Sequence, residues 1–342
     1  MVTTYPTFPT GITPAGAYHN QAGRIPQVAY TSPDGNFVFN LMGGNAIYDR
    51  TAPECVQLKG TKLPIPPWTN IEQKGASEDG ASYVLSLYDP LEVNLKLIIR
   101  GRDPAHLRQV IHDWIAAWDA KTEGQLSWTS TPQGSTTPET WWLPVRWGKA
   151  PEDDLAAINV YRQEVTWNAK SYGAFWQTDD NVASLSGGTI TLTNIGDQPM
   201  FPRYICYGPG TFTFADGPNS SDTVTFGPLV APQIVQLNTD PRKRGVVDLT
   251  TGDIPVAQQT PFQQALADFL TYATGGNQTA LATAIESKFG IVPPQGNLYS
   301  LLSGRWSDNA AIPPDGQPHT VSVSSTGGNV IAAGTPLRRW PQ

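Results

Sequence analysis

Apolar and polar residues alternate over long stretches of the chain, which predicts a protein built mainly from β-strands. The clearest stretch is 81–100, where apolar residues occupy every second position of its later part: Leu91, Val93, Leu95, Leu97 and Ile99. Such a period of two gives a strand one buried face and one exposed face. Strands are also expected within 31–39, 124–130, 140–148 and 157–176.

A different spacing predicts one helix between these strands. Apolar residues recur there at steps of three and four: Leu107, Val110, Ile111, Trp114, Ile115 and Trp118. Asp103 suits the N-cap and Pro104 the first helical position, while Gly124 is a suitable residue to end the helix. We expect this single helix to cover one face of a sheet or split barrel formed by the neighbouring strands.

Beyond residue 178 the pattern changes to shorter strands separated by turn-forming segments. Seven are expected, at TITLTN, RYICYG, TFTFADG, DTVTFG, PQIVQLN, GVVDLTTG and HTVSVSS. Short strands at close spacing are typical of a β-sandwich. The polar segment 177–183 therefore divides the chain into a first domain, 1–177, and a second domain, 178–342.

Two further segments depart from this strand pattern. Residues 258–297 carry apolar residues at helical spacing after Thr260-Pro261 and again after Asn277, which predicts a helical hairpin inserted into the sandwich. Residues 1–30 are rich in Thr, Pro and Gly, and we expect an extended N-terminal arm there. The expected fold class is mainly β (α+β).

Composition agrees with a β-rich protein and excludes several other classes. Charged residues are 15% of the chain, and it contains 32 Gly, 31 Pro, 11 Trp, 12 Tyr and 11 Phe. The aromatic residues exclude an intrinsically disordered chain, and the scarcity of charged residues excludes a coiled coil. Because no apolar run is long enough to cross a bilayer, we expect no membrane insertion.

Charge and cysteine usage bear on partners and location. With 22 Lys and Arg against 29 Asp and Glu, the net charge is −7, which argues against a general nucleic-acid binder. The N-terminal MVTTYPTFPTGITPAG lacks the basic start and apolar core of a signal peptide, so we expect assembly in a cytoplasm. Cys55 and Cys206 fit two buried thiols in a reducing compartment, and a disulfide between them is the alternative.

Residues that could carry catalysis form no recognisable motif. The nucleophile elbow, the phosphate-binding loop, the dinucleotide fingerprint and the zinc-protease motif are all missing from the sequence. His106 and His112 share the predicted helix, but six residues place them about 240° apart around its axis, so they cannot clamp one metal. We therefore expect no enzyme, no cofactor and no metal site.

Aromatic and basic residues supply the candidates for contact with a partner. Eight of the 11 Trp lie between Trp114 and Trp176, which favours a core or a subunit interface, with sugar binding by exposed rings as the alternative. Trp141 and Trp142 are adjacent in a predicted strand, so one faces the core and the other a partner or solvent. The candidate contact residues are Trp141, Trp142, Arg242, Lys243, Arg244, Arg338, Arg339 and Trp340.

Four stretches of the chain resemble one known family. They are TWNAKSYGAFW (166–176), LTNIGDQPMFPRYICYGPG (192–210), VQLNTDPRKRGVVDLTTG (235–252) and LYSLLSGRWSDNAAIPPDG (298–316). In order and in turn residues they resemble the distal tail proteins (Dit) of long-tailed, non-contractile phages (siphophages). In detail they resemble the minor tail proteins of phages of mycobacteria and their relatives. The resemblance spans most of the chain and is weakest over 1–80.

The resemblance implies an N-terminal belt domain related to the tail-tube fold over 1–177, and a galectin-like sandwich over 178–342. It also implies a homo-oligomeric ring, a hexamer, at the distal end of the tail of the virion. The expected partners are the tail-tube protein, the tip or baseplate hub and other minor tail proteins, and DNA passes through the channel without specific binding. The alternative function is a lectin-like, carbohydrate-binding module of the tail tip that contacts the host envelope.

Overall fold

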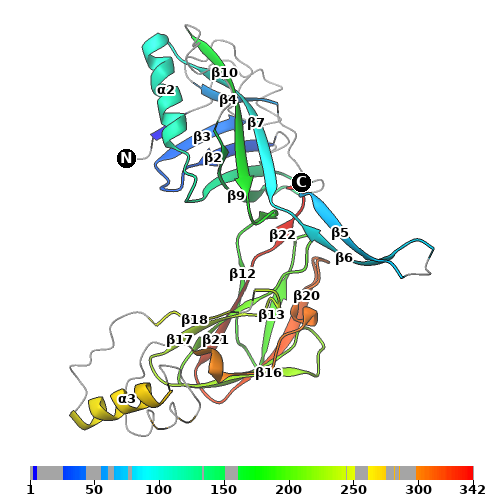
Figure 1. The fold of residues 1–342 in the computed structure, drawn as a ribbon, viewed down its shortest axis with the longest axis vertical. Helices are drawn as coiled ribbons and strands as arrows, with labels where there is room; N and C mark the ends of the chain where they lie inside the picture. The colour runs from blue at the N-terminus through cyan, green and yellow to red at the C-terminus, as the bar shows by residue number, and fades with distance from the viewer. Residues whose placement is uncertain are drawn as a thin grey trace. The chain divides into compact units, whose positions relative to one another are not determined.

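The computed structural model describes residues 3–5, 26–43, 55–60, 65–75, 79–132, 135–150, 161–243, 245–250, 261–274, 281, 285 and 298–341. The chain is mainly β, as expected (Figure 1). It divides into two compact units: unit 1 comprises Met1–Thr178 and Arg338–Gln342, and unit 2 is Asp179–Leu337. The residues from Arg338 onward therefore belong to unit 1, although we expected them in the second domain.

In the described part of the chain, unit 1 is organised around a ten-stranded sheet. Eight of its strands follow the order β1-β3-β2-β8-β9-β10-β7-β4, and β11 pairs with both β9 and β22. Along that order the pairs are antiparallel, apart from β1 with β3. The strands are β1 (Thr3–Tyr5), β2 (Gln27–Thr31), β3 (Phe37–Met42), β4 (Cys55–Gly60), β7 (Leu91–Arg100), β8 (Gly124–Ser130), β9 (Glu139–Lys149), β10 (Arg162–Ser171), β11 (Trp176–Gln177) and β22 (Leu337–Arg338).

Strand β9 joins the two halves of this sheet. Its first part, Glu139–Val145, pairs with β8, and its last part, Arg146–Lys149, pairs with the end of β10. Buried side chains from both halves belong to one apolar core. The result is a nearly closed, barrel-like sheet, in line with the expected split barrel.

Helix α2 (Pro104–Ala116) contributes its apolar stripe to the same core and begins as predicted. The Asp103 carboxylate accepts hydrogen bonds from the backbone N–H groups of Ala105 and His106, both at 2.8 Å. These bonds, above all the one from His106, hold the pKa of Asp103 below its usual value. Pro104 stands at the start of the helix, where a missing N–H costs no intrahelical bond.

The helix ends earlier than predicted. Its last residue is Ala116, whereas Gly124 was expected to end it. The chain turns instead at Asp119, whose carboxylate accepts the backbone N–H of Thr122 at 3.2 Å, and Gly124 is the first residue of β8. Trp118, expected on the helical stripe, lies just beyond the helix but is still buried.

Unit 2 is built, within its described residues, from two five-stranded sheets. The first has the order β12-β21-β14-β17-β18 and the second the order β13-β20-β15-β16-β19. Buried side chains from both sheets form one core, which is the arrangement of a β-sandwich. The strands are β12 (Asn181–Ser184), β13 (Thr189–Thr193), β14 (Arg203–Tyr207), β15 (Gly210–Ala215), β16 (Thr223–Leu229), β17 (Ile234–Asn238), β18 (Gly245–Asp248), β19 (Leu302–Ser303), β20 (Pro318–Ser325) and β21 (Asn329–Gly334).

Helical elements in the described part of unit 2 include α3 (Pro261–Thr274) and the 3₁₀ turns η2 (Leu298–Leu301) and η3 (Asp308–Ala310). Helix α3 is the first helix expected in the 258–297 insertion. The second expected helix, after Asn277, lies outside the described residues apart from positions 281 and 285. Most of the expected arm 1–30, the side chain of Cys55 and the whole of Arg244 also lie outside them.

Candidate functional site: contact surfaces

A two-stranded hairpin extends from unit 1. It consists of β5 (Trp68–Gln73) and β6 (Ser82–Tyr88), and among the described strands each pairs only with the other. Figure 1 shows the two strands running outward as an arm. Every residue of β5 and most of β6 are exposed. Because a lone hairpin of two strands is at best marginally stable in water, this arm is a candidate for a contact that covers it.

One face of the hairpin is apolar. The strand register places Ile71 opposite Leu85, and Leu87 opposite Thr69 at the next position on the same face. The three aliphatic side chains are 41%, 40% and 47% exposed for Ile71, Leu85 and Leu87. We call these three residues the hairpin patch. They are large apolar groups in contact with water in the single chain.

The middle of the opposite face is polar. The Ser86 hydroxyl donates a hydrogen bond to Asn70 Oδ1 at 2.7 Å, across the strand pair. The Tyr83 hydroxyl lies 3.0 Å from Ser86 Oγ and extends this polar row. The middle of this face is therefore suited to water, although Trp68, 58% exposed, stands two positions along it, and the hairpin patch on the other face is suited to burial.

The base of the hairpin is fixed to unit 1. The Tyr88 ring meets the Phe175 ring edge to face with centroids 4.9 Å apart. The Asp89 backbone N–H donates to the Pro67 carbonyl at 2.9 Å, and the Thr69 hydroxyl donates to the Asp89 carboxylate at 3.0 Å. The strand pair is thus closed at its root by contacts within the chain.

The structure brings together two of the predicted contact residues of unit 1, Trp141 and Arg338. The Arg338 guanidinium lies 4.1 Å from the centre of the Trp141 ring, and both side chains donate to Glu139 Oε2, at 3.3 and 3.2 Å. Trp141 is fully buried, so its ring is not available to a partner. Here Arg338 ties the end of the chain to β9.

The other predicted contact residues of unit 1 lie closer to the surface. Trp142 is partly exposed, which is the alternation with Trp141 expected in a strand. Trp340 is partly buried and packs on the core of unit 1, with its ring centre 6.3 Å from that of Trp128. Arg339 is exposed.

The predicted basic residues of the β17–β18 turn belong to unit 2. Arg242 and Lys243 are exposed, and Arg244 lies outside the described residues. Arg242 is held in place, because its backbone N–H and its Nε both donate to Asp240 Oδ1, at 2.9 and 3.3 Å. Its guanidinium also lies 5.4 Å from the centre of the Phe201 ring. The turn therefore presents an oriented cation.

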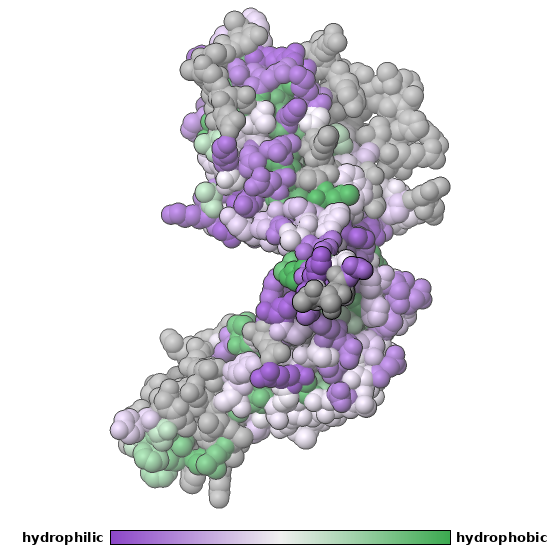
Figure 2. All heavy atoms as spheres, turned by 45° about the vertical axis from the view of Figure 1, so that its right-hand side comes forward, coloured by the Kyte–Doolittle hydropathy of each residue, from purple (hydrophilic) through white to green (hydrophobic). Residues whose placement is uncertain are grey.

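A second apolar surface lies on α3. Figure 2 shows hydrophobic atoms gathered over this helix. Its large exposed side chains include Phe269, 62% exposed, and Tyr272, 89% exposed. The helical spacing after Pro261 predicted the helix but not this exposure.

The described ranges also bear on metal binding and membrane insertion. No three His, Cys, Asp or Glu residues gather there in a way that could hold a metal ion. His106 Nδ1 accepts the Arg102 backbone N–H at 3.3 Å, while His112 Nδ1 lies 3.4 Å from Asp113 Oδ1. None of the described helices has the length and apolar character needed to cross a bilayer.

Comparison with known proteins gives likenesses of fold alone. No family model and no curated protein matches the chain. Three solved structures align with it over most of its length. These neighbours are phage hub and baseplate proteins.

The first is the crystal structure of the SPP1 Dit (gp 19.1) protein, described as a paradigm of the hub adsorption apparatus in phages that infect Gram-positive bacteria. Its TM-score is 0.49 at 12% identity, covering 90% of this chain and 98% of that chain. The others are the phage P2 baseplate in its activated conformation with Ca (TM-score 0.44, 10% identity, 91% and 98% covered) and with Sr (0.44, 11%, 90% and 97%). At these scores the alignments carry no function across to this chain.

Proposed function

We propose that this protein is a structural component of a phage tail tip that assembles with copies of itself into a closed ring. The observation that carries the proposal is the hairpin patch of Ile71, Leu85 and Leu87. Removing apolar surface from water lowers the free energy by roughly 25 cal/mol per Å². The two open strand edges of the arm can also pair with the backbone of another chain. A second copy of the chain supplies both the apolar cover and the strand partner.

The arm favours a ring over a simple two-fold dimer. When the arm of one subunit covers a different surface on the next, the contact is head to tail, and repeated head-to-tail contacts close into a ring or run on as a filament. We assign the arm of one subunit to a surface of unit 1 on its neighbour.

The setting comes from the sequence resemblance to distal tail proteins. It supports a hexamer that joins the tail-tube protein to the tip or baseplate hub, located at the tail tip of the virion. The acidic net charge of −7 suits a wall past which DNA slides without binding, because like charges repel. The proposal assigns the protein no catalysis.

The decisive experiment measures the mass and shape of the purified chain by light scattering and negative-stain imaging. The wild-type chain is expected to form a ring of six copies with a central hole. Ile71→Glu with Leu85→Lys places an ion pair at one register position of the patch and should give a folded monomer. The matched control is Asn70→Glu with Ser86→Lys, the same charges at the neighbouring register position on the polar face, and it should still form rings.

The outcomes separate the parts of the proposal. A wild-type chain that remains monomeric at its highest soluble concentration contradicts self-assembly. Rings that survive Ile71→Glu with Leu85→Lys contradict the hairpin patch as the contact and leave the ring intact. Far-UV circular dichroism spectra of both double variants that match the wild-type spectrum exclude misfolding as the cause of any difference.

Carbohydrate binding, the alternative function, is favoured by one separate feature. Unit 2 carries a loop-lined hollow, and its lining residues come from several connections of the sandwich. A ring protein can carry such a site in addition to its contacts. The chemistry of that hollow is independent of the ring.

A further inference from the structure

Connections from both sheets of unit 2 line an open hollow of about 710 Å³. Its walls come from the β13–β14, β15–β16 and β17–β18 connections, from η3 with the segment that follows it, and from the start of β20. The volume falls within the range of small-molecule sites, roughly 300–1,000 Å³. Loops held on a rigid scaffold are also the usual place for binding residues.

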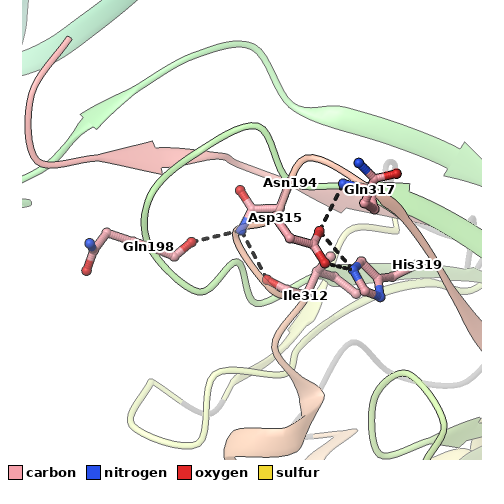
Figure 3. A network of polar contacts seen from close by, with 6 residues as sticks. All are labelled: Asn194, Gln198, Ile312, Asp315, Gln317 and His319. Atoms are coloured by element: carbon pink, nitrogen blue, oxygen red, sulfur yellow. Dashed lines mark hydrogen bonds and ion pairs between the residues drawn. The ribbon is translucent and has the colours of Figure 1, made fainter. Parts of the chain in front are cut away.

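Two of these walls are locked together by a buried amide. Asn194 is fully buried, and its Nδ2 donates to the carbonyls of Gln198 at 2.8 Å and Ile312 at 3.0 Å (Figure 3). Met200 and Ile312 also exchange backbone hydrogen bonds of 3.1 and 2.8 Å. The β13–β14 connection is thereby fixed to the segment between η3 and β20. The hollow is formed before any ligand arrives.

A buried carboxylate locks a third wall. Asp216, at the end of the β15–β16 connection nearest β15, is 3% exposed and accepts the Ser307 backbone N–H at 2.9 Å and its hydroxyl at 2.6 Å. The Ser307 hydroxyl in turn accepts the Asn309 N–H at 3.2 Å and caps η3. Gly217 has φ +98°, and a Cβ there would lie 1.8 Å from the Asn309 carbonyl oxygen. Glycine is required for this close approach.

The lining combines flat apolar surfaces with uncommitted polar side chains. Phe201 and four prolines supply the apolar part. The side chains of Asn219, Asp308 and Asn309 form no hydrogen bond within the described part of the chain, although all three line the hollow. Asn219 adopts φ +60°, a left-handed conformation that few residues other than Gly and Asn accept. Amides donate and accept, and a carboxylate accepts, so together they match the hydroxyls of a sugar.

The charges in the lining balance. Arg242 carries a positive charge over the Phe201 ring, and Asp308 carries a negative one. The His319 ring is already paired, with Nε2 between 2.8 and 3.0 Å from the two carboxylate oxygens of Asp315 (Figure 3). A site for phosphate or a sugar acid needs surplus positive charge, and this lining has none.

We propose that this hollow binds an uncharged saccharide. The C–H groups of the sugar ring pack on the apolar part of the lining, and its hydroxyls exchange hydrogen bonds with Asn219, Asp308 and Asn309. The site goes beyond the ring-forming role and does not depend on it, since every residue involved belongs to unit 2.

The test mixes the full chain with the methyl glycosides of glucose, galactose, mannose, rhamnose and N-acetylglucosamine. Saturation-transfer NMR detects binding, and titration gives the dissociation constant. At least one glycoside should bind with a dissociation constant on the order of millimolar, as expected for so small a ligand. Asn219→Gly keeps the left-handed backbone and removes the amide, and Asp308→Ala removes the carboxylate. Each should weaken binding about tenfold. Asp222→Asn, in the same β15–β16 connection but outside the lining, should bind as the wild type does.

Several results would overturn the proposal. They are no binding by any of the five glycosides, equal binding by wild type and both lining variants, and tighter binding of glucuronate or inorganic phosphate than of every neutral glycoside. A proline-rich decapeptide that displaces the bound glycoside and binds far more tightly than any glycoside would assign the hollow to a protein partner instead. Unchanged thermal unfolding midpoints of the variants show that any loss of binding comes from the lining.

Discussion

At the residue scale, unit 1 depends on tightly packed aromatic rings. Trp114 is fully buried and meets the rings of Tyr30, Phe39 and Trp167 edge to face, with centroids 5.0 to 5.7 Å apart. Its indole N–H has no hydrogen-bond partner in the described structure. Its stabilising contribution is therefore apolar burial and ring packing, which outweigh the cost of an unpaired donor. Burial likewise raises the pKa of the neighbouring Tyr30 hydroxyl well above its ordinary value.

Trp114→Ala should accordingly lower the free energy of unfolding of unit 1 by about 3–5 kcal/mol, through lost transfer energy and the cavity left behind. Denaturant unfolding followed by circular dichroism measures this. The matched control is Trp68→Ala, because Trp68 is 58% exposed on the hairpin and should change stability by about 0.5 kcal/mol or less. Equal losses in the two variants would show that Trp114 does not anchor the core.

At the scale of elements, glycines set how closely the connections of unit 2 approach each other. Gly217 and Gly316 both have positive φ, +98° and +71°. A Cβ at Gly217 would collide with the backbone of η3, whereas a Cβ at Gly316 would meet open space. The two positions thus separate the cost of the backbone conformation from the cost of a steric clash.

Gly217→Ala should destabilise unit 2 by more than Gly316→Ala does. Gly316→Ala carries only the cost of placing alanine in a left-handed backbone conformation, roughly 1–2 kcal/mol. Gly217→Ala carries that cost and must also displace η3. Thermal unfolding of the two variants beside the wild type gives the difference. A smaller loss for Gly217→Ala would mean that the β15–β16 connection moves freely away from η3.

Element boundaries show what local sequence determines and what it does not. Asp103-Pro104 predicted the start of α2 because the cap is made by neighbouring backbone groups. The predicted end of α2 at Gly124 was wrong, because the helix ends at Ala116 and the chain turns at Asp119. Strand β5 was missed because Trp68 and Ile71 are its only large apolar residues, and its partner β6 covers neither face.

At the scale of the whole molecule, the mainly β class, the sandwich of unit 2 and its seven expected strands followed from the sequence. The hollow did not, although Phe201, Arg242 and Asp308 lie in three of the stretches that carried the family resemblance. Their meeting depends on long-range pairing, such as β14 with β17 and β13 with β20, that local patterns do not contain. Burial also decided between the two tryptophans at 141 and 142, where alternation alone left the choice open.

Each unit has its own apolar core, so the two should unfold as separate cooperative transitions in calorimetry. Phe214 is fully buried in unit 2 and stacks on Tyr204 with ring centres 4.4 Å apart. Phe214→Ala should lower the free energy of unfolding of unit 2 by about 3–5 kcal/mol and leave the transition of unit 1 unchanged. Trp114→Ala should destabilise unit 1 and leave the transition of unit 2 unchanged. A fragment of residues 179–337 should fold alone and reproduce the transition that Phe214→Ala shifts. If one substitution moved both transitions together, or if the fragment failed to fold, the two cores would form a single cooperative structure. The reason is that a cavity in one core lowers the stability of the other only when the two units are energetically coupled.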